Sequence, residues 1–299
     1  MAAQEIRMSS LSILVTGAAG LIGSVATAYL RAQGHSVRAV DLHPGKGPAV
    51  EIADLLLRES AYRVTEAVDA VVHLANWPNV HLSAPSQVFI ENATMTQYLF
   101  QAIIERGIKK LVYASSIQAM SGHRQSDDGG PSGLPYLPLD GDIPANPSNA
   151  YGVSKAAGEI QTKWLAQSHG VAAVALRLPA VMRGSFHELR KRYGPRWMKS
   201  SLDEAFTAMH VCDAARLIEG ILTHHHSGYR CVQGGSHEHS LDRPIADIVA
   251  EYYADVPLRH PNQPLTALCD IGVLQRDFGF VPQESLWSTG ESAATSAQK

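Results

Sequence analysis

Cysteine is scarce in this sequence. Its three cysteines, Cys212, Cys231 and Cys269, are widely spaced, and no Cys-x-x-Cys pair occurs. Disulfide frameworks and cysteine-based zinc sites use closer, paired cysteines. We therefore expect free thiols and a location in a reducing compartment, the cytoplasm.

Long apolar runs and an excess of one charge are also missing. No apolar run reaches the roughly 18 residues of a membrane-spanning helix, and Met1 to Ser10 lack the pattern of a signal peptide. The net charge is -3 at pH 7, and the basic residues form no long run. We therefore expect neither nucleic acid nor a membrane as a partner. A small-molecule substrate is the remaining expectation.

The chain does contain a regular alternation of strand and helix patterns. Strand patterns occur at residues 12–16, 36–40, 70–74, 111–114 and 172–176, and helical patterns run up to Leu30, over 89–106 and over 151–168. Strands that alternate with helices form a parallel sheet covered on both faces. The sequence predicts an α/β fold with a doubly wound parallel sheet of the Rossmann type. A further helix over 211–222 and then irregular structure are expected to follow.

A glycine-rich turn joins the first strand to the first helix. It reads Gly17-Ala-Ala-Gly20-Leu21-Ile22-Gly23. Backbone amides and a helix N-terminus at such a junction can hold a pyrophosphate. Gly17 would make the turn, Gly20 would let the backbone approach the phosphates, and Gly23 would allow the helix to pack closely on the strand.

An acidic residue ends the second strand. Asp41 lies at the distance along the chain that is typical of a carboxylate bound to the adenosine ribose. A carboxylate there repels a 2′-phosphate, so NAD is favoured over NADP. Arg38 and His43 are nearby cations that could weaken this preference, although Arg38 is expected to face outward.

Tyr151-Gly-Val-Ser-Lys155 places a phenol and an ammonium on the same face of a helix, one turn apart. A tyrosine has an ordinary pKa of about 10 and is a poor base at neutral pH until a positive charge stabilises its phenolate. Lys155 can supply that charge. This arrangement is typical of a tyrosine that transfers a proton.

Together these motifs resemble the extended short-chain dehydrogenase/reductase family, which comprises NAD-dependent sugar epimerases, dehydratases and dehydrogenases. The resemblance spans about residues 11–281. Besides the glycine turn, Asp41 and the Tyr-Lys pair, it rests on the following residues: Asp54-Leu55, His73-Leu74-Ala75, Asn92, Ser115-Ser116 and Arg177-Leu-Pro179.

The resemblance implies roles for these residues. Asp54 and Leu55 would contact the adenine, Leu74 and Ala75 would line the cofactor groove, and Pro179 would lie near the nicotinamide. Asn92 would lie on the helix that faces the active site, beside the cofactor, in a structural role. Ser116 would be the third catalytic residue with Tyr151 and Lys155, with Ser115 as the lesser candidate.

The reaction implied is hydride transfer between NAD and a hydroxyl carbon of a sugar or sugar-derived acid. Tyr151 would take the hydroxyl proton, Ser116 would hold the oxygen, and Lys155 would lower the Tyr151 pKa and bind the nicotinamide ribose. Ile117-Gln118 stand where dehydratases of the family carry Asp-Glu, so a dehydratase is not expected. The short segment between Arg177 and His210 is similar to that of uronate dehydrogenases. A nucleotide-sugar 4-epimerase with tightly held NAD and a non-catalytic NAD-sensing protein are the alternatives.

Other residues are weaker candidates. Trp77, His81, Gln118 and Met120 follow strand ends and are expected to contact the substrate. Arg183, Arg190, Lys191, Arg192 and Arg196 form a basic cluster that could bind an anion or simply be a solvated helix face. His224-His-His226 and His237-Glu-His239 lack further ligands at metal-site spacing, so no metal is expected.

The domain organisation follows from the motifs. Residues 1–178 are expected to form the NAD-binding domain, 179–287 a small substrate-binding lobe interleaved with the last sheet elements, and 288–299 a disordered tail. The helices over 89–106 and 151–168 resemble the pair through which the family forms homodimers. Their apolar stripes could equally face only the sheet.

Overall fold

A single parallel sheet organises the chain. The computed structural model describes residues 10–45, 49–79, 81–122, 134–194 and 202–287. Its seven-stranded sheet has the order β3-β2-β1-β4-β5-β6-β9, and every neighbouring pair is parallel. The strands are β1 (Ser12–Thr16), β2 (Ser36–Asp41), β3 (Glu51–Ile52), β4 (Ala70–His73), β5 (Lys110–Ser116), β6 (Ala172–Leu178) and β9 (Tyr229–Gln233). The predicted doubly wound parallel sheet is confirmed.

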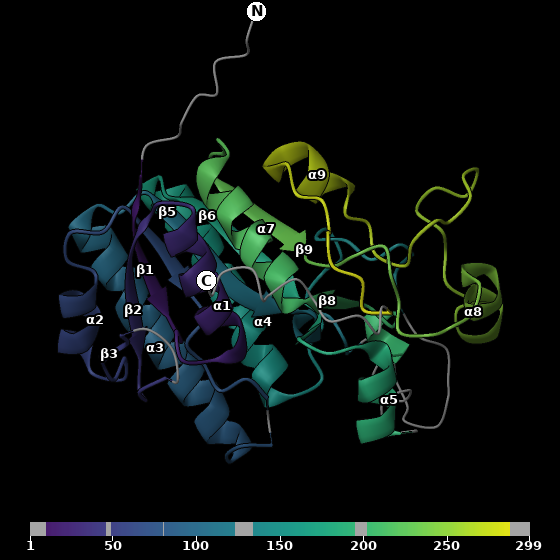
Figure 1. Ribbon diagram of the computed structural model, residues 1–299, viewed down its shortest axis with the longest axis horizontal. Coiled ribbons are helices and arrows are strands. Elements are labelled where there is room, and N and C mark those ends of the chain that lie inside the picture. The colour runs from purple at the N-terminus through teal and green to yellow at the C-terminus, as the bar shows by residue number, and fades with distance from the viewer. Residues whose placement is uncertain (1–9, 46–48, 80, 123–133, 195–201, 288–299) are drawn as a thin grey trace, which may run out of the picture.

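Helices cover both faces of this sheet (Figure 1). One face packs against α1 (Leu21–Ala32), α7 (Val211–Thr223) and α9 (Gly272–Phe278), and the other against α2 (Arg58–Val64), α3 (Pro85–Arg106) and α4 (Ala150–His169). Because both faces are covered, the central strands β1, β4, β5 and β6 are buried along nearly all of their length and are mostly apolar. This is why they stand out in the sequence.

The remaining elements form a smaller layer at one end of the sheet. They are the strands β7 (Ala180–Met182) and β8 (Ala208–His210), the helices α5 (Phe186–Tyr193) and α8 (Ile245–Tyr252), and the 3₁₀ turns η1 (Ile117–Ala119) and η2 (Leu202–Glu204). Strands β7 and β8 pair with each other, outside the main sheet. Two apolar clusters hold this layer together: one includes Met120, Phe206 and Tyr253, and the other includes Phe186 of α5 and Ala208 of β8.

Two details differ from the sequence-based expectation. Helix α3 begins at Pro85 rather than at residue 89, because proline is well suited to the first helical turn, where its missing N–H has no partner to lose. The region after Leu222, expected to be irregular, contains β9, α8 and α9. The predicted boundary at residue 178 stays a prediction, and the predicted tail over 288–299 lies outside the described residues. No helix in the described ranges has the length and apolar character to cross a membrane.

Candidate active site

The glycine turn sits tightly against the end of β4. Gly17 has φ +70°, which L side chains rarely adopt, and a Cβ there would stand 2.7 Å from the Ala75 nitrogen. A Cβ at Gly23 would collide with the Gly17 carbonyl oxygen. The turn and the close approach of α1 to β1 therefore both require glycine.

Helix α1 begins at this turn with unpaired amides. Its N-cap residue, Gly20, has no side chain to accept a hydrogen bond, and no acidic residue lies in the first turn. The amides of Leu21 and Ile22 are in that first turn, where helical N–H groups lack carbonyl partners. This helix end can hold an anion such as a pyrophosphate.

Asp41 closes β2 beside the same turn. Its Oδ2 accepts a hydrogen bond from the Ala19 amide at 3.0 Å, and its Oδ1 accepts one from the His43 amide at 3.1 Å. Asp54, at the neighbouring strand end, accepts the Leu56 amide at 2.9 Å, and Leu55 is buried. Around them stand exposed apolar side chains, Leu42, Ile52 and Leu57. A carboxylate within an apolar rim suits a ribose and a flat adenine ring.

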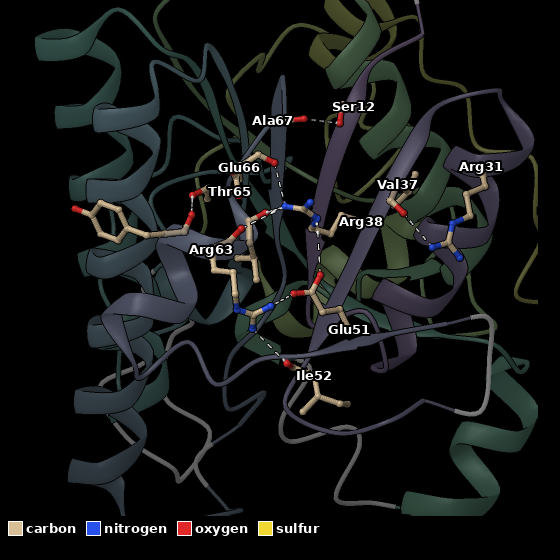
Figure 2. Close-up of polar contacts among 12 residues, drawn as sticks. Ser12, Arg31, Val37, Arg38, Glu51, Ile52, Arg63, Thr65, Glu66 and Ala67 are labelled. Carbon is tan, nitrogen blue, oxygen red and sulfur yellow. Dashed lines mark hydrogen bonds and ion pairs between the residues drawn. The ribbon is translucent and has the colours of Figure 1, made fainter.

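Arg38 is not available to a ligand at this end of the sheet. Figure 2 shows its guanidinium turned toward the carboxyl end of α2, where it donates to the carbonyl oxygens of Val64 and Glu66 at 3.0 Å each. It also lies 3.8 Å from the Glu51 carboxylate. The side chain caps a helix, so Arg38 does not oppose the preference for NAD that is expected from Asp41.

Ser116, Tyr151 and Lys155 come together where β5 ends and α4 begins. The Ser116 hydroxyl lies close enough to the Tyr151 phenol to lower its pKa, and the Lys155 ammonium lies 5.6 Å from the centre of the Tyr151 ring. All three side chains are buried. The Lys155 Nζ donates to the Ala114 carbonyl oxygen at 2.7 Å, which fixes the lysine against β5.

Burial dominates the acid–base properties of the pair. It raises the pKa of Tyr151 to about 12, against the lowering effect of the Ser116 hydrogen bond, and a nearby Glu204 raises it further. Burial also lowers the pKa of Lys155 to about 7, while Glu159 acts to raise it. The expectation that Lys155 brings the Tyr151 pKa toward neutrality is not met in this structure. The ammonium lies over the ring and bonds a carbonyl, so desolvation outweighs its effect.

Ser115 contacts a different residue of α4. Its hydroxyl donates to the Glu159 carboxylate at 2.6 Å, and Glu159 also receives two hydrogen bonds of 2.8 Å from the Arg177 guanidinium. The Ser115 hydroxyl is thus engaged by Glu159 and ties β5 to α4, whereas Ser116 acts on Tyr151.

Buried polar residues fix the loop after β4. The Thr16 hydroxyl accepts the amides of Leu74 and Ala75 at 3.2 Å. The Asn92 side chain accepts the Trp77 amide at 2.7 Å and donates to the Ser154 hydroxyl at 3.1 Å. Asn92 thus joins this loop to the helix that carries Tyr151, which is the structural role expected of it. Pro179 follows β6 directly and is buried.

The candidate substrate residues are spread more widely. The Trp77 indole donates to Glu91 at 2.6 Å, and His81 is exposed. Gln118 lies in η1, directly after Ser116, and accepts a hydrogen bond from Asn149 at 3.2 Å. The Arg183 guanidinium lies 3.3 Å from the Ser24 hydroxyl of α1, on the side of the glycine turn. Their contact with a substrate stays a prediction.

The basic cluster is dispersed where the structure describes it. Arg190 donates to the Ser240 carbonyl oxygen at 2.7 Å and stacks on Trp287, away from Arg183. Arg196 lies outside the described residues, as does the side chain of Arg192.

One group of potential metal ligands occurs in the described ranges, and it is not one of the two histidine groups of the sequence. His210, Cys212 and Glu284 lie together. The His210 ring accepts the Cys212 amide and contacts the Arg183 carbonyl oxygen, and Glu284 pairs with Arg216. These groups already have protein partners, so we interpret the cluster as structural.

Glu204 is a site residue that the sequence did not reveal. It ends η2, and Gln118 acts to lower the pKa of its carboxylate, which burial raises. Its charge acts on Tyr151. No motif marks this position, because the contact depends on a turn far along the chain from β5.

Comparisons with known proteins agree with this geometry. The model of the NAD dependent epimerase/dehydratase family matches residues 13–230. The chain is 26% identical over 230 residues to a uronate dehydrogenase of Pseudomonas syringae pv. tomato, covering 75% of this chain and 74% of the relative. It is 24% identical to a UDP-glucose 4-epimerase of Corynebacterium glutamicum, with 92% of each chain covered.

A solved structure shares the fold. It is a short-chain dehydrogenase/reductase superfamily protein from Agrobacterium tumefaciens with bound NAD, which superimposes with a TM-score of 0.69 at 20% identity. The superposition covers 92% of this chain and 93% of that one.

Proposed function

Because this chain belongs to the NAD dependent epimerase/dehydratase family, we propose that it is an NAD-dependent oxidoreductase with Tyr151 as its acid/base. The substrate is a sugar or a sugar-derived acid, and the carbon that is oxidised carries a hydroxyl group. The observation that carries this proposal is the convergence of the buried Ser116, Tyr151 and Lys155 at the carboxyl end of the sheet. Ligands of open α/β sheets bind at that edge.

The residues around the glycine turn fit NAD. The amides at the start of α1 lack partners and suit the pyrophosphate, and the Asp41 carboxylate suits a ribose that carries no 2′-phosphate. Bound NAD supplies the hydride acceptor, and the protein supplies orientation and proton transfer.

Each catalytic residue then has one task. The Tyr151 oxygen accepts the proton of the substrate hydroxyl as the carbon is oxidised. The Ser116 hydroxyl holds the same substrate oxygen, because it lies beside the Tyr151 phenol and acts on it. The Lys155 ammonium, fixed by the Ala114 carbonyl oxygen, lies 5.6 Å from the centre of the Tyr151 ring and would bind the nicotinamide ribose.

A 4-epimerase is the second candidate, favoured by the match to the Corynebacterium glutamicum enzyme over nearly the whole chain. Both reactions begin with the same proton and hydride transfer. They differ in whether the oxidised intermediate leaves or is reduced again on its other face.

A substrate panel followed at 340 nm tests this proposal. The panel contains free uronates, free aldoses and UDP-sugars, each with added NAD. Net NADH formation supports the dehydrogenase, and product without net NADH supports the epimerase. Silence with every compound, despite tight NAD binding, would instead identify an NAD-sensing protein.

We also propose a homodimer that forms through α3 and α4. Exposed apolar side chains lie on both helices: Ile90 on α3, and Val153, Ile160 and Trp164 on α4. The three on α4 share one helix face. The Ile160 side chain is 71% exposed. The variant Ile160→Glu should be a monomer in analytical ultracentrifugation and should keep its secondary structure.

A cytoplasmic location fits the three free thiols of the described chain and remains part of the proposal.

A further inference from the structure

The short turn that follows Ser116 is held by the serine itself. The Ser116 hydroxyl oxygen accepts the Gln118 amide at 3.2 Å and so caps the 3₁₀ turn η1. The oxygen serves as the acceptor in this bond, and the hydroxyl hydrogen is left available for donation to a substrate oxygen. The position of the Ser116 hydroxyl therefore depends on the position of η1.

Asn149 connects this turn to the helix that carries Tyr151. Its side-chain oxygen accepts the Gly152 amide at 2.9 Å, which caps the first turn of α4. Its side-chain nitrogen donates to the Gln118 side-chain oxygen at 3.2 Å. A helix cap needs only the acceptor, so the donor is an additional function of the asparagine. One amide group thus holds the start of α4 with one atom and η1 with the other.

Backbone contacts join the same two segments. The Asn146 amide donates to the Ala119 carbonyl oxygen at 2.9 Å, and the Gly122 amide donates to the Asn146 carbonyl oxygen at 2.6 Å. A Cβ atom at Gly152 would collide with the Gln118 carbonyl oxygen, so this glycine lets α4 approach η1 closely. The turn after β5 and the start of α4 are therefore packed against each other without a gap that a side chain could fill.

The bond between Asn149 and Gln118 lies close to both catalytic groups along the chain. Gln118 is two residues after Ser116, and Asn149 is two residues before Tyr151. The proposed reaction needs the serine hydroxyl and the phenol to meet the same substrate oxygen. Misplacement of a reacting group by about 1 Å can cost about a hundredfold in rate. A bond that joins the two segments at this point therefore affects the reaction itself.

We propose that Asn149 is a positioning residue that acts through Gln118 and sets the Ser116 hydroxyl relative to the Tyr151 phenol. Asn149 itself touches neither substrate nor cofactor in this role. The inference rests on the proposed function, since it takes Ser116 and Tyr151 to act together on one substrate oxygen. Direct contact between Gln118 and the substrate is the competing role, and the experiment below distinguishes the two.

Two substitutions separate this bond from the helix cap. Asn149→Ser keeps a good capping residue at the start of α4 but removes the nitrogen that donates to Gln118. Gln118→Met removes the acceptor and keeps a side chain of similar length. Each variant should lower kcat by about tenfold with the substrate found in the panel, while the KM for NAD stays unchanged. The double variant should lose no more than either single variant, because both substitutions remove the same bond.

Two controls show what a merely structural role would give. Asn149→Ala removes the cap as well, so it should lower the midpoint of urea unfolding, whereas Asn149→Ser should keep the wild-type midpoint. Gln101→Met removes an exposed hydrogen bond to Glu105 on α3 and should change neither kcat nor KM. If Asn149→Ser keeps the wild-type kcat, Asn149 is only a helix cap and the proposal is wrong. A higher substrate KM in Gln118→Met, with kcat kept, would show direct substrate contact and would also overturn it.

Nuclear magnetic resonance gives a readout that needs no turnover. The tyrosines are labelled at Cζ with a magnetic carbon isotope, and Tyr151→Phe identifies the Tyr151 signal. Ser116→Ala gives the signal shift caused by loss of the serine hydroxyl. Asn149→Ser and Gln118→Met should move the signal in the same direction, and Gln101→Met should not; an unmoved signal in Asn149→Ser would contradict the proposal. If the signal moves as expected but no compound of the panel gives NADH or product, the proposed function fails and the positioning role of Asn149 stands.

Discussion

Replacing Glu159 with glutamine should destabilise the fold much more than the loss of a surface ion pair. Glu159 receives two hydrogen bonds of 2.8 Å from Arg177 and one of 2.6 Å from Ser115. The side chains of Arg177 and Glu159 are only 3% and 7% exposed. Removing the carboxylate leaves a buried guanidinium without its counter-charge, which costs about 3–5 kcal/mol.

Urea unfolding measures this cost. The matched control is Glu251→Gln, because Glu251 pairs with Arg243 where the side chains are 47% and 41% exposed, and the loss there should be about 0–1 kcal/mol. A double variant, Glu159→Leu with Arg177→Met, removes both charges and should recover much of the stability. A loss below about 1 kcal/mol for Glu159→Gln, or no recovery in the double variant, would refute the reasoning.

Three further predictions concern the cofactor and the catalytic lysine. Gly23→Ala should lower both thermal stability and NAD affinity, because its Cβ would collide with the Gly17 carbonyl oxygen. In Gly20→Ala the new Cβ would lie 3.2 Å from the same oxygen. This variant should keep the fold and lose only NAD affinity, measured by calorimetry. Asp41→Asn should raise NADP affinity relative to NAD by about tenfold; an unchanged ratio would show that Asp41 does not face the ribose. Burial lowers the pKa of Lys155 from 10.5 to about 7, so the unfolded chain holds more protons between these values. The wild type should therefore gain stability as pH rises through this range, and Lys155→Met should not; equal slopes would contradict the buried titration.

The sheet and the glycine turn were predictable because their signals are local. Each central strand is buried on both faces and therefore apolar along its length, and Gly17 and Gly23 occur where backbone geometry leaves room for no side chain. The short elements after Leu222 were not predictable in the same way. Helices α8 and α9 are only eight and seven residues long, too short for periodicity to separate them from loops.

The site was predictable only in part. Tyr151 and Lys155 are one helical turn apart in sequence, so their proximity follows from the helix itself. The choice of Ser116 over Ser115 depended on the partners of each hydroxyl: Ser115 is engaged by Glu159, whereas Ser116 acts on Tyr151. Glu204 could not be found, because its position depends on two left-handed residues and on Phe206 packing against Tyr252. The pKa values of Tyr151 and Lys155 reflect burial, which the sequence does not report.

The central claim is that Tyr151 transfers the proton in a hydride transfer to NAD. The most direct measurement is the rate of NADH formation at 340 nm for the wild type and Tyr151→Phe, with a substrate found in the panel and with NAD affinity measured for both proteins. The phenylalanine keeps the ring that lies beside Lys155 and removes only the hydroxyl. The account predicts an unchanged NAD affinity and a rate that falls by roughly a hundredfold or more. A variant that keeps more than about a tenth of the wild-type rate would contradict it.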